Sequence, residues 1–115
     1  MHVIFHQITS WLDGSAVYGS TDVDLQVLRT FTGGKLKQYN MSRRKALLPQ
    51  LVHPPDGECF VSSPRLFCFA AGDPRVNEQP GLTTMHTLWL RQHNLVSDSL
   101  AAINPHWNEV CITYL

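Results

Sequence analysis

Arg75 and Glu78 are the two charged residues whose types and spacing could support chemistry. They lie three residues apart in the stretch AGDPRVNEQP (residues 71–80), just before an apolar segment with helical spacing. An arginine can stabilise developing negative charge in a site that excludes water, and a carboxylate can hold a cofactor. The same pair could instead be a surface ion pair, with Glu78 favouring the start of the helix that follows. The residue types alone leave both interpretations open.

A second group of chemically useful residues lies near the start of the chain, in TSWLDGS. Thr9, Asp13 and Ser15 place side-chain oxygens at intervals along this short loop, which also contains a glycine. Oxygen ligands of this kind suit Ca²⁺, which takes six to eight of them. The same residue types form turns far more often than they bind metal. On residue type alone an ordinary turn is the favoured interpretation, and a metal would need further ligands from elsewhere.

The residues that follow Glu78 predict a long helix over 80–103. Its apolar residues recur at helical spacing: Leu82, Met85, Trp89, Val96, Leu100 and Ile103. Pro80 suits the first turn of a helix, and Asn104-Pro105 should end it. His86 and His93 fall on the same face but are separated by about 10 Å of helical rise, too far to share one metal. We expect them to be packed or hydrogen-bonded.

The rest of the chain predicts little regular structure. A short helix is expected near Thr21–Arg29, capped by Ser20 or Thr21 and ended by Gly33-Gly34. Residues 35–74 contain five prolines and few periodic runs. Compact domains rarely contain so long an irregular stretch, which indicates that the sequence belongs to a larger fold. The expected fold class is mainly α, with helices joined by long loops.

The three cysteines allow one short disulfide. Cys59 and Cys68 bracket the segment CFVSSPRLFC, in which Pro64 would help the chain turn back, and Cys111 is left over. A Cys59–Cys68 disulfide would indicate an oxidising compartment. Two buried thiols are the alternative, and the disulfide is the favoured of the two.

Composition excludes several classes of function. The 115 residues have no net charge, which argues against a nucleic-acid partner because phosphate binding needs clustered Lys and Arg. No stretch approaches the roughly 18 apolar residues of a membrane span. The opening residues, MHVIFHQITS, lack the basic start and the long apolar run of a signal peptide.

Several long motifs occur together and in a fixed order. They are QITSWLDGSAVYGS, LLPQ, the Cys59/Cys68 loop, CFAAGDPRVNEQPGLTTMHTLWLRQHN and INPHW. This set closely resembles the animal haem peroxidases over about residues 7–109. The resemblance implies that residues 1–115 are a partial haem peroxidase domain, an internal fragment of that fold.

The resemblance also implies roles for individual residues. Arg75 matches the arginine on the distal side of the haem, which polarises bound peroxide. Glu78 matches the glutamate that can form an ester with a haem methyl group, so haem b is the expected cofactor. Gln79 stands where some members have a methionine linked to the haem, so that link is expected to be absent.

The loop motif implies a calcium site in the same family. Its ligands would be Thr9, the carbonyl oxygen of Trp11, Asp13 and Ser15. The resemblance therefore favours calcium where the residue types alone favour a turn.

Other parts of the family's site have no match in this sequence. The distal histidine, with an aspartate that forms a second haem ester, lies upstream of the calcium loop, and the iron-binding histidine lies downstream of INPHW. His2 and His6 do not fall in either motif, so neither role is assigned to them.

The family's activity is haem-dependent reduction of hydrogen peroxide with oxidation of a donor, in response to oxidative stress and outside the cell. The donor is not identified by the sequence, and turnover by this chain would need the rest of a peroxidase chain as partner. The alternative is a catalytically inactive, truncated extracellular protein used for binding or adhesion.

Overall fold

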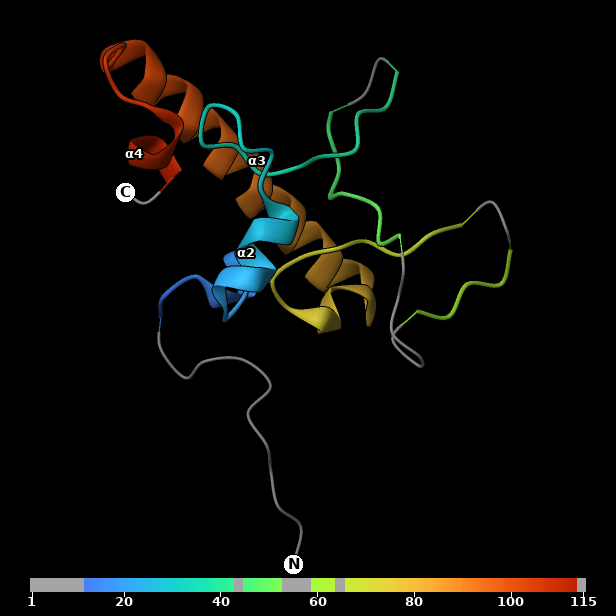
Figure 1. Ribbon diagram of the computed structural model, residues 1–115. Helices are drawn as coiled ribbons and strands as arrows, with labels where there is room; N and C mark the ends of the chain where they lie inside the picture. Colours follow the sequence, from blue (N-terminus) through green and yellow to red (C-terminus); the bar gives the residue numbers. More distant parts are fainter. Residues whose placement is uncertain (1–11, 43–44, 53–58, 64–65, 114–115) are drawn as a thin grey trace, which may run out of the picture.

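The computed structural model describes residues 12–42, 45–52, 59–63 and 66–113. Four α-helices and one 3₁₀ helix (η1) follow one another along this part of the chain, and Figure 1 shows them joined by long loops. Their bounds are α1 Ser15–Tyr18, α2 Asp22–Leu28, η1 Pro74–Asn77, α3 Pro80–Ile103 and α4 Glu109–Thr113. The predicted mainly helical architecture with long connections is confirmed.

The loops between α2 and η1 pair only at isolated positions. Three antiparallel bridges occur among the described residues, and they join Arg29 to Leu36, Tyr39 to Leu47, and Gln50 to Phe69. Since no strand forms among the described residues of this region, most of their backbone polar groups need partners other than a sheet. The expectation of an irregular middle region is therefore confirmed as well.

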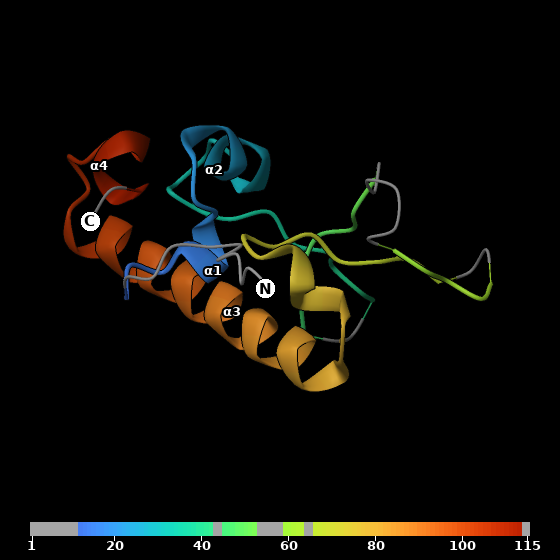
Figure 2. The same ribbon diagram turned by 90° about the horizontal axis from the view of Figure 1, so that it is seen from below.

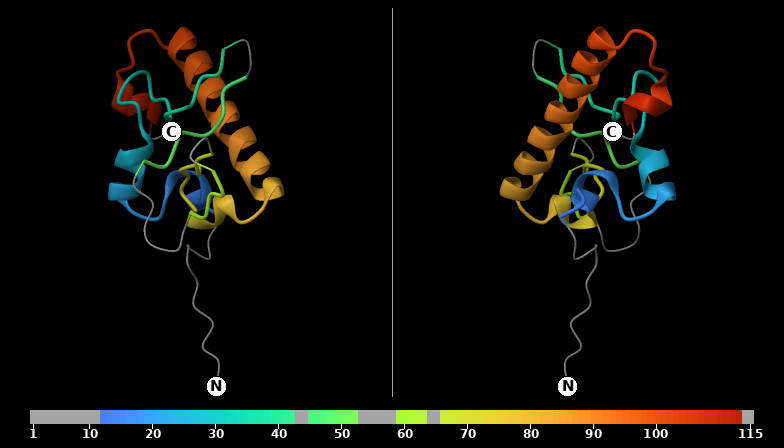
Figure 3. Two further views of the ribbon diagram at one scale, coloured as in Figure 1. Left: turned by 90° about the vertical axis from the view of Figure 1, so that its right-hand side faces the viewer. Right: turned by 90° about the vertical axis from the view of Figure 1, so that its left-hand side faces the viewer.

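Helix α3 is the element against which α1, η1 and α4 pack, while α2 packs against α1. It runs for 24 residues from Pro80 in its first turn to Ile103, with Asn104 at its C-cap. Figure 2 shows α1, α2, η1 and α4 on one side of it, and both views of Figure 3 show α3 lengthwise along one edge of the molecule. The helix is thus covered along one side only.

The apolar stripe of α3 lies on the uncovered side. Met85, Trp89 and Ile103 are 52%, 56% and 74% exposed, and Val96 is exposed as well. These exposures show that the other described elements leave much of the stripe uncovered. His86 and His93 do not share its environment, because His86 is buried and His93 is half-buried against the loops.

The covered side of α3 is instead rich in polar residues. Asn94 accepts a hydrogen bond from Leu36 N at 2.8 Å and donates one to Leu36 O at 3.0 Å. Ser97 donates to Gly34 O at 3.2 Å. These side chains supply the partners that a strand would otherwise supply to the irregular backbone. A polar buried face is therefore the consequence of packing a helix against loops.

The apolar core is small. It consists of one residue from α2, two from the loops, one from η1 and one from α3: Leu28, Leu36, Leu48, Val76 and Leu90. Core burial is the main favourable term in folding, and five buried side chains provide little of it for a chain of this length.

Helix α2 forms as the sequence predicts at its start but not at its end. Thr21 caps it, and a capping box joins Thr21 to Asp24. The helix ends at Leu28, so the prediction that Gly33-Gly34 ends it is wrong. Both glycines have positive φ, 63° and 67°, and form the turn that brings Leu36 back beside Arg29. Glycine adopts this conformation without steric cost.

The isolated 115-residue chain is expected to aggregate or to unfold at a low temperature. The exposed apolar stripe of α3 offers a surface through which copies of the chain can associate. The small core gives the folded state little stability against this. Circular dichroism on heating, together with size-exclusion chromatography, tests this. A monomer with a cooperative transition at high temperature would contradict it. Met85→Lys with Val96→Lys, which changes only exposed positions, should improve solubility and serves as the matched control.

Candidate functional site

Arg75 and Glu78 are brought to the same side of the molecule by η1. The 3₁₀ helix spans Pro74–Asn77, and Glu78 N donates to Arg75 O at 3.0 Å. Side chains three residues apart eclipse one another in a 3₁₀ helix. Both residues are exposed, and the pKa of Arg75 is raised, mainly by its hydrogen bond to Asp73 and least by the negative charge of Glu78. The structure therefore presents a cation and a carboxylate together on an accessible surface.

Asp73 holds the guanidinium of Arg75 in a two-point contact. Arg75 Nε donates to Asp73 Oδ1 at 3.0 Å, and Nη2 donates to Oδ2 at 2.7 Å. The hydrogen bond from Arg75 holds the pKa of the Asp73 carboxyl below its usual value. The same bond is the main cause of the raised pKa of Arg75. Both groups therefore stay charged across the physiological range.

The guanidinium keeps donors for another ligand. An arginine has five N–H donors in a planar fork, and Asp73 takes two of them on one edge. Within the described ranges no other side-chain acceptor is found for the guanidinium, and the Arg75 side chain is 43% exposed. The opposite edge can therefore bind an oxygen ligand or a small anion.

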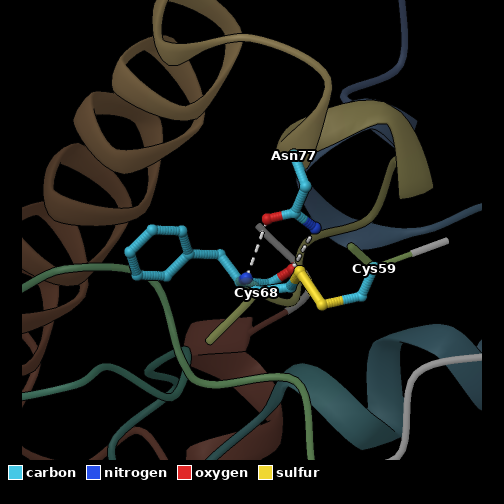
Figure 4. Close-up of a disulfide and its surroundings, with 4 residues drawn as sticks. Cys59, Cys68 and Asn77 are labelled. Atoms are coloured by element: carbon cyan, nitrogen blue, oxygen red, sulfur yellow. Dashed lines mark hydrogen bonds between the residues drawn. A yellow bond between two sulfur atoms is a disulfide. The ribbon is translucent and has the colours of Figure 1, made fainter. Parts of the chain in front are cut away.

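The backbone of η1 is fixed on one side by Asn77 and a disulfide. Asn77 Oδ1 accepts from Phe69 N at 2.8 Å, and its Nδ2 donates to Phe69 O at 2.9 Å. Phe69 follows Cys68, which is bonded to Cys59, and Figure 4 shows the disulfide beside Asn77. The predicted disulfide is thus confirmed; it closes the loop that ends beside Phe69, and the Asn77 hydrogen bonds join that loop to η1.

Contacts with α3 fix the other side of η1. Val76 is only 1% exposed and belongs to the core. Thr83, in the first turns of α3, donates from its hydroxyl to Val76 O at 2.6 Å. The turn between η1 and α3 is therefore held by packing and by a hydrogen bond.

Gly72 places this region directly against α1. A Cβ at Gly72 would clash with Gly19 N, Ser15 O and the carbonyl carbon of Val17, all of them backbone atoms. Two backbones can approach this closely only where one residue has no side chain. Helix α1 and the segment that leads to Arg75 are consequently in contact.

The structure describes two of the four expected calcium ligands. Asp13 Oδ1 accepts from Ser15 N at 3.0 Å, which places the two residues on one tight turn with Gly14 at φ 75° between them. Asp13 is exposed and Ser15 is buried. Thr9 and Trp11 lie outside the described residues. In the described part of the chain, no three His, Cys, Asp or Glu side chains are grouped as a metal would need.

The two histidines of α3 have structural partners. His93 Nδ1 lies 3.0 Å from Tyr18 Oη, and its Nε2 lies 2.7 Å from Gly34 O. Burial lowers the pKa of His86, an effect opposed by the negative charge of Asp73. The expectation that these histidines are packed or hydrogen-bonded is confirmed.

Glu78 borders a groove large enough for a sizeable ligand. The groove has a volume of about 660 Å³ and is also lined by Gln79 and by apolar side chains that include Phe60, Leu66, Phe67, Phe69 and Leu88. Binding sites for cofactors are typically of this size and mainly apolar, with a few polar groups. The groove therefore has the size and the mainly apolar lining that suit a large ring system, with the Glu78 carboxylate of the protein at its edge. Arg75 is not one of the residues that line it.

Sequence reasoning overlooked three residues that build this site. Asp73 precedes Pro74, and an Asp followed by proline is a typical helix start, so its capping role could have been predicted. Gly72 and Asn77 carry no comparable signal. Their roles depend on α1 and on Phe69, which the fold brings to them.

A family model and curated relatives point to the same family. A model of the family described as animal haem peroxidase matches residues 3–112. The peroxidasin homolog of Mus musculus is 45% identical over 108 residues, which cover 90% of this chain and 7% of the relative. Thyroid peroxidase of Sus scrofa is 41% identical over 109 residues, covering 88% of this chain and 12% of the relative.

A solved structure supports the same conclusion. Peroxidase A from Dictyostelium discoideum matches with a TM-score of 0.75 and 31% identity, covering 90% of this chain and 20% of that structure. The chain therefore spans a fifth or less of these relatives. Its fold, its motifs and the family match together show that it belongs to the animal haem peroxidase family.

Proposed function

We propose that this chain is part of a haem-dependent peroxidase that reduces hydrogen peroxide while oxidising a donor. The supporting observation is the Arg75–Asp73 pair, which leaves one edge of a charged guanidinium accessible beside Glu78. Since the chain spans a small share of its relatives, the other groups of the site would come from the rest of a peroxidase chain.

In this proposal Arg75 acts on the peroxide. Its free N–H groups bind and orient a peroxide oxygen and stabilise negative charge as it develops there. Such donors are effective because they are already oriented before the reaction begins. A haem, when bound, supplies the redox chemistry.

Glu78 and the groove beside it would hold that haem. The apolar walls would suit the ring, and the Glu78 carboxylate, which borders the groove, would form the ester with a haem methyl group. Gln79 has no sulfur atom, so it cannot form a sulfonium link. The cofactor proposed is therefore haem b with an ester bond to Glu78.

The loop before α1 is proposed to bind calcium. Asp13 and Ser15 would be ligands together with Thr9 and the carbonyl oxygen of Trp11. Support comes from the tight turn that joins Asp13 to Ser15 and from the preference of Ca²⁺ for oxygen ligands.

An extracellular location is proposed as well. The Cys59–Cys68 disulfide supports it, because disulfides persist in oxidising compartments. None of the described helices is both long and apolar enough to cross a membrane.

The haem assignment can be tested on the protein at its natural length. We expect it to purify with haem, and its tryptic peptide 76–91, which contains Glu78, to carry the mass of one haem. Glu78→Gln should release that peptide unmodified, while Asp98→Asn, an exposed carboxylate on α3, should leave it modified. A protein without haem and without peroxide-dependent oxidation of guaiacol would instead support the non-enzymatic binding or adhesion protein.

A further inference from the structure

We propose that Asp73 is a positioning residue for the reaction with peroxide. It would fix the plane of the Arg75 guanidinium, so that the N–H groups of the opposite edge face the peroxide. This inference rests on the proposed peroxidase function, and in particular on the role given there to Arg75.

The geometry of the pair carries the proposal. Both carboxylate oxygens of Asp73 are engaged, Oδ1 by Arg75 Nε at 3.0 Å and Oδ2 by Nη2 at 2.7 Å. A two-point contact between planar groups fixes direction as well as distance. A long arginine side chain that is 43% exposed has many other rotamers available. Asp73 removes that freedom.

Asp73 is itself held in place more firmly than a surface carboxylate. It is 5% exposed, and its Oδ1 also accepts from Arg75 N at 3.0 Å. Gly72 before it is packed against the backbone of α1, and Pro74 after it has a fixed φ. The anchor is therefore rigid although the guanidinium it holds is exposed.

Two simpler roles compete with positioning. Asp73 could act only as the N-cap of η1, in which case its loss would lower stability and nothing else. It could also act only by neutralising Arg75, in which case removing its charge should speed the reaction. Asp73→Asn separates these roles, since the Asn oxygen can still cap Arg75 N while its amide group opposes Nη2 donor to donor.

The test is a double-mutant cycle in the haem-loaded protein at its natural length. The variants are Asp73→Asn, Arg75→Ala and the two combined, with Asp98→Asn as the control for losing an exposed carboxylate. Three quantities are measured. They are the rate of reaction with hydrogen peroxide, the thermal midpoint of unfolding, and the dissociation constant for cyanide, which is followed by the change in the haem absorption band.

Positioning predicts strongly non-additive kinetics. Asp73→Asn alone should slow the reaction with peroxide about tenfold, because displacements below about 1 Å already lower rates appreciably, and should weaken cyanide binding. In the Arg75→Ala background it should change neither quantity, while any decrease in thermal midpoint should occur in both backgrounds. Asp98→Asn should match the parent protein.

Different failures have different meanings. A native or faster rate in Asp73→Asn, or an equal effect in both backgrounds, would overturn the positioning role and leave the role of Arg75 intact. Native rates in Arg75→Ala would overturn the assignment of Arg75, and the positioning role with it.

Discussion

Replacing Arg75 with alanine is expected to slow the reaction with hydrogen peroxide by about 10²–10³-fold, the usual effect of removing one preorganised donor from a reacting oxygen. Haem content should change little, because Arg75 does not line the groove beside Glu78. The loss is kinetic because the free edge of the guanidinium is proposed to contact peroxide. Rapid mixing of the haem-loaded protein with peroxide measures the rate, and the haem absorption band measures cofactor retention.

Arg75→Lys is the informative companion variant. Lysine keeps the positive charge but cannot make the planar two-point contact with Asp73. We expect an intermediate rate, since charge is retained and orientation is lost. If Arg75→Ala lowers haem retention and reaction rate to the same extent, Arg75 has a structural role and the proposed role in peroxide binding is wrong.

Replacing Gly72 with alanine is expected to destabilise the fold by roughly 3 kcal/mol, at the upper end for overpacking. The added Cβ would meet backbone atoms of Gly19, Ser15 and Val17, and backbone cannot move aside as a flexible side chain can. Relief of the clash must separate α1 from the segment that carries Asp73 and Arg75. Chemical denaturation of the natural-length protein measures the change.

Gly81→Ala is the matched control for this substitution. Gly81 lies in the first turn of α3, and a Cβ there would approach only the Gln79 side chain, at 3.4 Å from its Oε1. Alanine is the better helix former by about 0.5–1 kcal/mol, so this variant should be as stable as the parent or slightly more stable. Equal destabilisation by both substitutions would show that the close approach at Gly72 does not determine stability.

The elements with local signals were predictable from the sequence. Helix α3 follows from its periodic apolar residues and from Pro80, and the start of α2 follows from Thr21 and Asp24. The Cys59–Cys68 disulfide was favoured by its short spacing. The residues that determine the start of α2 and the disulfide lie within about ten positions of one another, and those of α3 recur at helical spacing along the whole helix, so each pattern can be read along the chain.

The contacts that hold the site together were not predictable in the same way. Asn94 and Ser97 bind the backbone of a loop some 60 residues earlier, and an isolated polar residue in a helix does not identify its partner. Gly72 depends in the same way on α1. The end of α2 was misplaced because a glycine pair can end a helix or form a later turn, and only the bridge between Arg29 and Leu36 decides which.

The chemical roles, unlike the helices and the disulfide, could not be inferred from local sequence patterns. Residue types alone left Arg75 and Glu78 between a surface pair and a functional one, and favoured an ordinary turn over a metal site for TSWLDGS. The structure adds the two-point contact between Arg75 and Asp73 and the groove beside Glu78. Both favour the functional interpretation of Arg75 and Glu78. The roles of haem, peroxide and calcium rest on membership of the family.

The most direct test of the central claim is to add hydrogen peroxide to the purified natural-length protein and follow the haem absorption band. The claim is that Arg75 and Glu78 belong to the peroxide-binding side of a haem site. The claim predicts that the haem band changes at a rate proportional to peroxide concentration and that a phenolic donor restores it. In Arg75→Ala the same change should be far slower. A protein that binds no haem, or whose haem band does not respond to peroxide, would contradict it.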